Sequence, residues 1–76
     1  MAVNYAYNYA EIDDATHMCL GVVTTTDPDM DGMQTDVGST YITIPVYDEE
    51  YLMKYYINGN WYEDAEGTIP WTSSLL

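Results

Sequence analysis

Basic residues are almost absent from this 76-residue chain. Lys54 is the only one and there is no arginine, whereas aspartate and glutamate together number 13, which gives a formal net charge of −12. Nucleic acids and anionic membranes are held mainly by Lys and Arg. The composition therefore excludes a phosphate-binding surface, and neither nucleic acid nor a membrane is expected as a direct partner.

Cysteine and long apolar segments are also scarce. Cys19 is the single cysteine, so it cannot form an internal disulfide. No apolar run approaches the roughly 20 residues that span a bilayer, and residues 1–9 lack the positive start and apolar core of a secretory signal. We expect a chain that is made and kept in a reducing cytoplasm, or that leaves it only as part of a larger assembly.

Phenylalanine is missing too, although the chain holds nine Tyr and two Trp and is 47% hydrophobic. It is too apolar and aromatic for a disordered acidic polymer. A chain of this length buries only about 60% of the surface that its unfolded form exposes, so we expect one small domain without a roomy catalytic cleft. Repulsion among the acids weakens the compact monomer at low salt, and association or a bound cation would offset this repulsion.

A Tyr-rich alternation predicts a first hairpin. Residues 4–12 alternate with a period of two and read as a strand, followed by turn signals at residues 13–16. Residues 17–25 resume the alternation and supply the second strand. Gly21, in the middle of that strand, indicates a bulge or a close backbone approach.

A loop and a third strand follow. Residues 26–40 lack apolar periodicity and carry many Asp and Gly residues, so we expect an exposed loop. Residues 41–46 alternate again and predict a strand. Because Pro45 cannot donate a ladder hydrogen bond, this strand is expected at a sheet edge.

A short helix and a second hairpin are predicted next. Asp48 is a capping residue, with Glu49 and Glu50 behind it, for a helix of at most two turns. Asn58-Gly59 is typical of a type I′ turn, since both residues accept positive φ. The turn fixes the cross-strand pairs as Tyr55 with Tyr62, Tyr56 with Trp61, and Ile57 with Asn60.

The expected fold is thus α+β and β-rich. It consists of a small antiparallel sheet of two hairpins plus one strand, one short helix and an extended C-terminal tail. The β-rich domain occupies residues 1–64. The tail, residues 65–76, carries Ile69-Pro70-Trp71 and an apolar end, and we expect it to dock onto this domain or onto a partner chain.

The order of these motifs resembles small modules of bacteriophage tails. The matching elements are a Tyr-Ala-Glu-Ile-Asp strand, a Cys-Leu-Gly-Val strand, an Ile-Pro-Val-Tyr-Asp segment before an acidic helix, and a Lys-Tyr-Tyr-Ile-Asn-Gly-Asn-Trp hairpin. The resemblance covers residues 5–64, least well in the loop of residues 27–39. It implies a virion component, either a small separate protein or the terminal module of a tail fibre, with no enzymatic residues to carry over.

One stretch has the form of a truncated calcium loop. Asp27, Asp29 and Asp31 occupy alternate positions before Gly32, as at the start of such loops. A complete twelve-residue loop would end on a bidentate Glu, where this chain has Gly38. Asp36 is a substitute ligand for weakly bound calcium. The alternative is an exposed acidic turn without a metal.

No catalytic set can be assembled from these residues. His17 and Cys19 share a face of the predicted strand, but no second His or Cys completes a zinc site and no orienting group marks a nucleophile. A small buried thiol and a surface imidazole explain both. The adjacent acids at residues 13–14 and 49–50 are explained by a turn and a helix start. We therefore expect a protein that is not an enzyme and has no required cofactor.

The aromatic residues exceed what one small core can absorb. Tyr56 and Trp61 are expected in the core of the second hairpin. Partner contact is expected at the Tyr5, Tyr7 and Tyr9 stripe and at three tail residues, Trp71, Leu75 and Leu76. Because every large ring in the chain carries a polar atom, each suits a half-buried position at an interface.

Together these features favour an associative function. The expected protein is a bacteriophage virion structural protein of the tail or fibre apparatus, made in the host cytoplasm, which binds copies of itself or another phage structural protein. A host receptor or a glycan stacked on the rings is a further candidate partner. The alternative is a small acidic inhibitor that imitates nucleic acid and binds a basic host protein.

Overall fold

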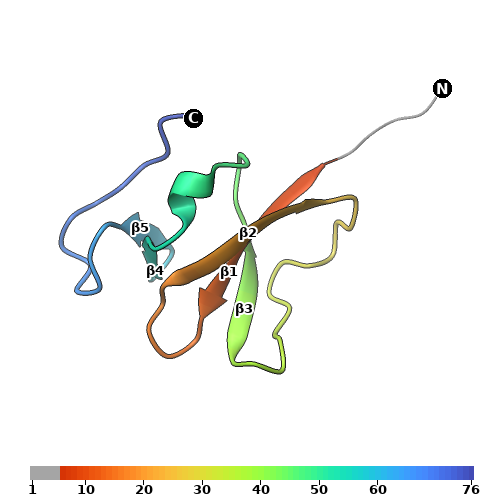
Figure 1. Ribbon diagram of the computed structural model, residues 1–76, viewed down its shortest axis with the longest axis horizontal. Coiled ribbons are helices and arrows are strands. Elements are labelled where there is room, and N and C mark those ends of the chain that lie inside the picture. Colours follow the sequence, from red (N-terminus) through yellow and green to blue (C-terminus); the bar gives the residue numbers. More distant parts are fainter. Residues whose placement is uncertain (1–5) are drawn as a thin grey trace.

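The computed structural model describes residues 6–76, and this part of the chain is mostly β. Its elements are strands β1 (Tyr7–Asp13), β2 (Cys19–Thr25), β3 (Ser39–Thr43), β4 (Tyr55–Ile57) and β5 (Asn60–Tyr62) and the 3-10 turn η1 (Glu49–Tyr51). A three-stranded antiparallel sheet has the order β2-β1-β3, and β4 pairs with β5 in a second sheet (Figure 1). The prediction of a small β-rich fold is confirmed.

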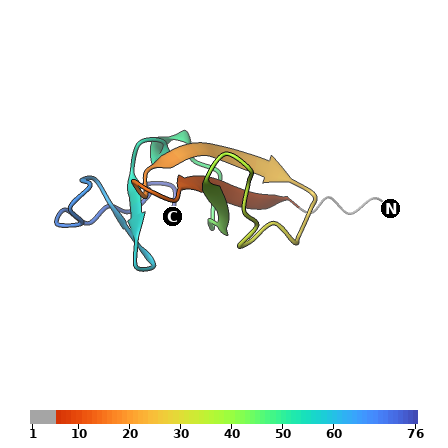
Figure 2. The same ribbon diagram turned by 90° about the horizontal axis from the view of Figure 1, so that it is seen from below.

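The two-stranded sheet and the long acidic loop lie at opposite ends of the molecule. Figure 2 shows β4, β5 and the C-terminal segment at one end and the loop between β2 and β3 at the other. The N-terminal end of β1 points toward the loop end. The second hairpin and the loop that covers β3 are therefore far apart.

β1 and β2 form the predicted first hairpin, and the expected irregularity lies beside Gly21. The register shifts between Glu11, which faces Gly21, and Ile12, which faces Cys19. A Cβ atom on Gly21 would meet Glu11 Oε1 at 3.8 Å, an ordinary van der Waals distance. Of the two alternatives, the position thus marks a bulge rather than a close backbone approach.

β3 occupies Ser39–Thr43 instead of the predicted residues 41–46. It starts earlier because Ser39 pairs with Asp13 at the end of β1. Its pairing stops after Ile44, whose N–H donates to Asn8 O at 2.9 Å, so Pro45 lies beyond the strand. The strand is nevertheless at the sheet edge, as predicted.

The acidic loop between β2 and β3 folds back along the outer edge of β3. The N–H of Gly32 donates to Tyr41 O at 2.8 Å, and the N–H of Tyr41 donates to Met33 O at 2.9 Å. Asp31 Oδ1 accepts from the N–H of Thr43 at 2.8 Å and from its hydroxyl at 3.0 Å. The loop backbone and the Asp31 side chain together supply the hydrogen-bond partners that a fourth strand would otherwise supply to this edge of the sheet.

The prediction of a short helix of at most two turns is wrong, since the described residues contain one 3-10 turn and no α-helix. Asp48 does cap the turn, because its Oδ1 accepts from the N–H of Glu50 at 2.9 Å. Met53 then adopts a positive φ of 69°, and its N–H donates to Cys19 O. The N–H of Cys19 donates in turn to Lys54 O at 2.8 Å. Backbone bonds to β2 thus take the place of a second helical turn.

The β4–β5 hairpin has the predicted register. Tyr55 pairs with Tyr62, Tyr56 with Trp61, and Ile57 with Asn60. Asn58 and Gly59 have φ of 50° and 84°, as a type I′ turn requires. The hairpin prediction is therefore confirmed. It was possible because the residues that determine the turn are adjacent in the sequence.

The core lies on one face of the three-stranded sheet. Its buried members are Ala10, Ile12, Cys19, Ile44 and Tyr51. Partly buried side chains packed against them are Val22, Ile42, Val46, Tyr56, Trp61 and Trp71. The strands of the main sheet, η1 and the aromatic end of the molecule therefore share one core.

Tyr9 lies on the opposite face of the sheet, and its predicted role in partner contact is wrong. Its side chain is 1% exposed, and its hydroxyl donates to Asp27 O at 2.7 Å. The acidic loop covers this ring, so no partner can reach it. Alternation alone could not predict this cover, because the loop reaches Tyr9 through a contact 18 residues away along the chain.

The C-terminal segment packs on the same chain. The N–H of Trp71 donates to Trp61 O at 3.0 Å, and the N–H of Glu63 donates to Ile69 O at 2.8 Å. These bonds place the segment beside β5, at the outer edge of the two-stranded sheet. Trp71 thus contacts its own chain, whereas Leu75 and Leu76 are exposed. Docking of the tail onto a partner chain stays a prediction.

Candidate binding groove

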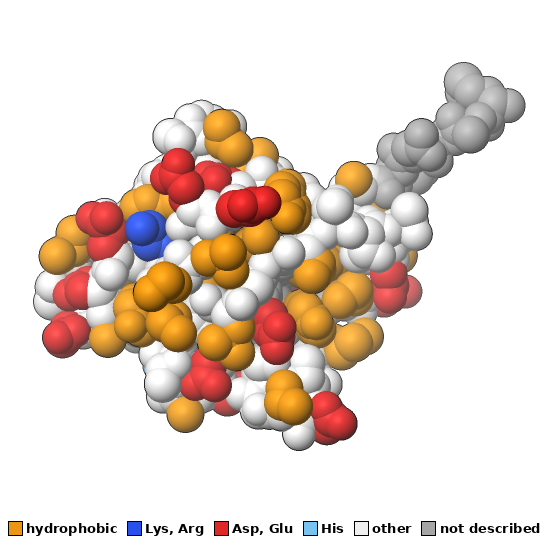
Figure 3. Space-filling view, in the orientation of Figure 1, with side chains coloured by type: hydrophobic (Ala, Val, Ile, Leu, Met, Phe, Trp, Pro, Cys, Tyr) orange, Lys and Arg blue, Asp and Glu red, His pale blue; other side chains and the backbone are white. Residues whose placement is uncertain are grey.

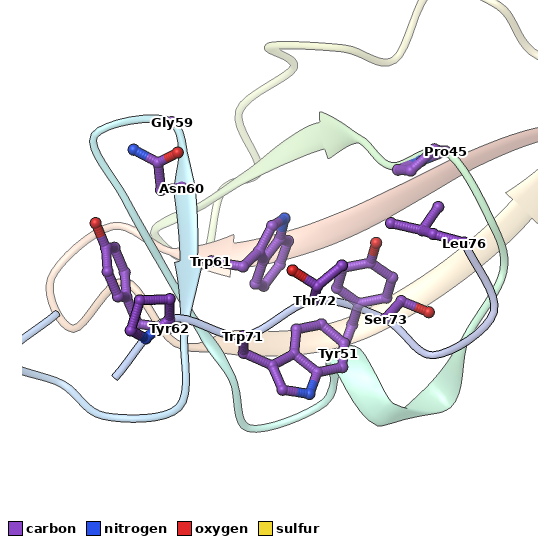
Figure 4. Close-up of a pocket in the computed structure, with 11 residues that line it drawn as sticks. Pro45, Tyr51, Gly59, Asn60, Trp61, Tyr62, Trp71, Thr72, Ser73 and Leu76 are labelled. Atoms are coloured by element: carbon purple, nitrogen blue, oxygen red, sulfur yellow. The ribbon is translucent and has the colours of Figure 1, made fainter. Parts of the chain in front are cut away.

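A groove opens between β5, η1 and the C-terminal segment. Its cavity of about 530 Å³ is lined by residues 59–62, residues 70–73, Pro45, Tyr51 and Leu76. Figure 4 shows the rings of Tyr51, Trp61 and Trp71 grouped together, with Tyr62 toward one end and Pro45 and Leu76 toward the other. Among the described residues no charged side chain lines it. The groove is thus an uncharged, ring-lined surface on a highly acidic protein.

Four aromatic rings line this groove, those of Tyr51, Trp61, Tyr62 and Trp71, and three of them pack against one another. The ring centroids of Tyr51 and Trp61 are 4.7 Å apart, and those of Tyr51 and Trp71 are 4.9 Å apart, both edge to face. Tyr56 lies 5.1 Å from Trp61. Lys54 Nζ lies 5.2 Å from the centroid of Trp71, a cation–π distance. Such pairs contribute roughly 0.5–1.5 kcal/mol each beyond burial, so the rings hold one another in place.

Tyr51 is the most buried of these rings, at 2% exposed. Burial is the largest cause that raises the pKa of its phenol, and the charge of Asp48 and the proximity of Cys19 raise it further. The hydroxyl therefore stays protonated at neutral pH. It can act in the groove only as a neutral hydrogen-bonding group.

A buried polar pair positions the C-terminal segment beside the rings. The hydroxyl of Ser73 donates to Asp48 Oδ2, and both residues are buried. The other oxygen of Asp48 accepts from the N–H of Glu50. Ser73 Oγ also accepts from the N–H of Leu75 at 3.1 Å. One carboxylate thus fixes both the start of η1 and the last turn of the chain.

The predicted contact residues are distributed over separate places. Tyr5 lies outside the described residues. Tyr7 is half-buried on β1, away from the groove lining. Trp71 lines the groove, and so does Leu76, which is 66% exposed, whereas Leu75 is 61% exposed next to it. The groove therefore unites the tail part of the predicted set and leaves the N-terminal stripe out.

The hairpin residues assigned to the core also contribute to the groove. Trp61 lies in its wall, and Gly59 lies at its rim. Tyr56 packs behind Trp61. Asn58 forms the turn. Core and candidate binding surface are continuous in this small domain.

The acidic loop does not gather its carboxylates into one cluster. Asp27 Oδ1 accepts from the N–H of Asp29 at 2.9 Å, while Asp31 is bound to Thr43 of β3. Asp36 is exposed. Within residues 6–76 no group of three acidic, His or Cys side chains is arranged to hold a metal. Calcium at Asp27, Asp29, Asp31 and Asp36 stays a prediction that requires the loop to rearrange.

His17 and Cys19 lie in different environments. His17 is exposed in the turn with φ of 66°, whereas Cys19 is buried at 1% exposure. Burial raises the pKa of the Cys19 thiol to about 11. The thiol stays protonated at neutral pH and donates to Gly21 O at 3.3 Å. The structure places these two groups as a surface imidazole and a core thiol.

Several groove residues were not predicted from the sequence. Tyr51 was expected only as part of a helix, and Pro45, Thr72 and Ser73 had no assigned role. The available signal was the apolar Ile69-Pro70-Trp71 run in an acidic segment. It indicated a docked tail, but the position of its docking site depends on the Asp48–Ser73 contact across 25 residues.

No family model, curated protein or solved structure matches this chain. Within the described residues no helix is long and apolar enough to cross a membrane. The groove itself is therefore the basis for a functional proposal.

Proposed function

We propose that this chain is a non-enzymatic structural protein of a bacteriophage virion, in the tail or fibre apparatus. It docks onto a neighbouring virion protein, or onto another copy of itself, through the ring-lined groove and the adjacent Leu75 and Leu76. The phage assignment rests on the resemblance of the strand and hairpin motifs to small tail modules. The docking assignment rests on the groove.

The observation that carries the proposal is the exposed apolar end beside an uncharged groove. Leu75 and Leu76 are 61% and 66% exposed, and Leu76 belongs to the groove lining. Full burial of a Leu side chain contributes about 1.5–3 kcal/mol. A partner that covers both leucines and the rings would thus gain a favourable free energy without desolvating a charged side chain of the groove lining.

The distribution of acids supports apolar docking over imitation of nucleic acid. In Figure 3 the acidic side chains of the visible face stand in separate groups between apolar and other polar groups. A nucleic-acid mimic requires carboxylates aligned along one face, and its binding falls steeply as salt rises. Separate acids around an uncharged groove instead limit nonspecific association and preserve solubility.

Mass spectrometry of purified particles tests the proposal. Particles from cells that carry the gene are banded in about 0.5 M salt, where screening removes weak ionic contacts. We expect the chain to remain with the particles. Its absence from them, or its salt-sensitive capture of a basic host protein instead, would overturn the proposal.

A pair of variants tests the groove. Leu76→Glu places a charge at the groove and should reduce incorporation into particles about tenfold or more, which corresponds to about 1.4 kcal/mol. Val37→Glu is the matched control, since Val37 is 75% exposed in the acidic loop and the charge change is the same. Equal incorporation of the two variants would show that the groove is not the docking site.

A further inference from the structure

We propose that the outer edge of β2 is a homodimer interface, at which two copies join their three-stranded sheets into one continuous antiparallel sheet. This inference deepens the self-association part of the proposed function. Its test uses the isolated protein, so the absence of the chain from particles would not decide it.

The backbone groups along the two outer edges of the three-stranded sheet have hydrogen-bond partners to different extents. Along β3, the acidic loop supplies partners to both Tyr41 and Thr43. Along β2, backbone bonds from outside the sheet reach only Cys19, from Met53 and Lys54 at the start of the strand. Within residues 6–76 the rest of the β2 edge has no strand beside it.

The register shows which groups face outward. The N–H of Ile44 donates to Asn8 O, so the backbone groups of Asn8 face β3. Successive residues of a strand direct their N–H and C=O groups to opposite edges. The backbone groups of Tyr9 therefore point toward β2, and those of its partner Val23 point toward β1. The N–H and C=O groups of Val22 and Thr24, on either side of Val23, therefore point away from the sheet.

Apart from the segment at η1 and residues 53–54, which contacts the Cys19 end of β2, this edge lacks the usual devices against pairing. Natural sheet edges are protected by charges, prolines or covering segments. From Ala15 to Thr26 the chain has no acidic residue, no Lys and no Pro, although 13 of its 76 residues are acidic. β2 instead offers Val and Thr, which favour strands. β2 itself is thus uncharged, and beyond Cys19, where residues 53–54 that follow η1 bond to it, its outward backbone groups have no backbone partner among residues 6–76.

A second copy is the occupant that fits these features. A two-fold axis at Val23 sets Val22 of each copy opposite Thr24 of the other in antiparallel pairing, and the outward N–H and C=O groups then bond reciprocally. Two chains of charge −12 repel each other, so the repulsion between two copies is smallest where the segments in contact carry no acid. The paired β2 strands are such segments.

Sedimentation equilibrium and a lysine variant test this interface. We expect a reversible dimer whose dissociation constant falls as salt rises, because screening weakens the repulsion between the two acidic copies. Thr24→Lys, at an exposed position, places a charge opposite Val22 of the other copy and brings two like charges to diagonal positions across the axis, so it should weaken the dimer at least about tenfold. Val37→Lys carries the same charge change on the acidic loop and should dimerise like the wild type. Thr24→Val keeps a β-branched side chain and should also dimerise.

Amide hydrogen exchange in the wild type gives a second test, which does not depend on the folding of a variant. In the wild type, protection of the Val22 and Thr24 amides should rise with protein concentration, while that of core amides stays constant. A monomer at about 1 mM protein, where even a millimolar Kd would be visible, would overturn the inference. So would a dimer in which these two amides exchange fast, or one that Thr24→Lys leaves as tight as Val37→Lys does.

Discussion

The hydroxyl of Ser73 donates to the buried carboxylate of Asp48, which lies 25 residues earlier in the chain. The same carboxylate caps η1 through the N–H of Glu50. A single side chain thus ties the C-terminal segment to the start of the 3-10 turn and holds the groove between them. Together with the backbone bond from Trp71 to Trp61, this contact holds the groove in shape.

Ser73→Ala should destabilise the fold. The substitution leaves one oxygen of the buried Asp48 carboxylate without its partner, at a cost of about 1–3 kcal/mol in the free energy of unfolding. Urea denaturation followed by tryptophan fluorescence measures this change. Ser74→Ala, at an exposed neighbouring position, is the control and should stay within about 0.5 kcal/mol of the wild type. Equal midpoints for the two variants would contradict the role assigned to Ser73.

Gly59→Ala should weaken the second hairpin. Gly59 has φ of 84°, a conformation that costs an L-residue about 1–2 kcal/mol, although the space around the position is open. Gly21→Ala is the matched control, because that site has no positive φ and its added Cβ would make only an ordinary contact. Thermal melts should show a lower Tm for Gly59→Ala than for Gly21→Ala, and the reverse order would refute the turn geometry.

The Asp64 carboxylate should contribute stability that is lost in acid. Its pKa is lowered from 3.8, chiefly by the hydroxyl of Thr68 and then by the N–H of Ile69. A lowered folded-state pKa means that the contribution is complete above the unfolded value and disappears as pH falls through the folded value. The difference in unfolding free energy between wild type and Asp64→Asn should therefore be constant near neutral pH and shrink below about pH 4.

Glu66→Gln is the control for this titration, because it removes one charge in the same loop. It reports the effect of net charge alone. If both variants show the same pH dependence between about pH 2 and 7, the hydrogen bonds to Asp64 do not favour its ionised form.

Cys19 should resist alkylation in the folded protein. Its thiol is 1% exposed, and burial raises its pKa to about 11, so little thiolate is present at pH 8. Iodoacetamide should label the unfolded chain in urea much faster than the native chain. Mass spectrometry over time distinguishes the two rates, and comparable rates would show that Cys19 is accessible.

Local patterns were sufficient to predict some parts of this fold and not others. The β4–β5 hairpin followed from Asn58-Gly59, because the chemistry of a two-residue turn fixes the register of both strands. The helix prediction failed after Tyr51, where Met53 and Lys54 bond to Cys19 of β2. A tertiary backbone contact of that kind leaves no periodic trace in the sequence.

The candidate site was only partly predictable for the same reason. Trp71 and Leu76 stood out as apolar residues in the tail that follows the acids of residues 63–66, and both line the groove. Tyr9 looked like an interface residue, because the loop that covers it makes its contact through Asp27 O, a backbone atom that any residue would supply. Side-chain identity therefore carried the tail prediction but could not reveal the cover over Tyr9.

The reciprocal bonds between Cys19 and residues 53–54 connect the two sheets through the backbone. The core likewise runs without a break from Ala10 of the main sheet to Tyr51 and Trp61. Neither sheet can come apart without exposing the core of the other. Heating should therefore produce a single cooperative transition, in which calorimetric and van't Hoff enthalpies agree.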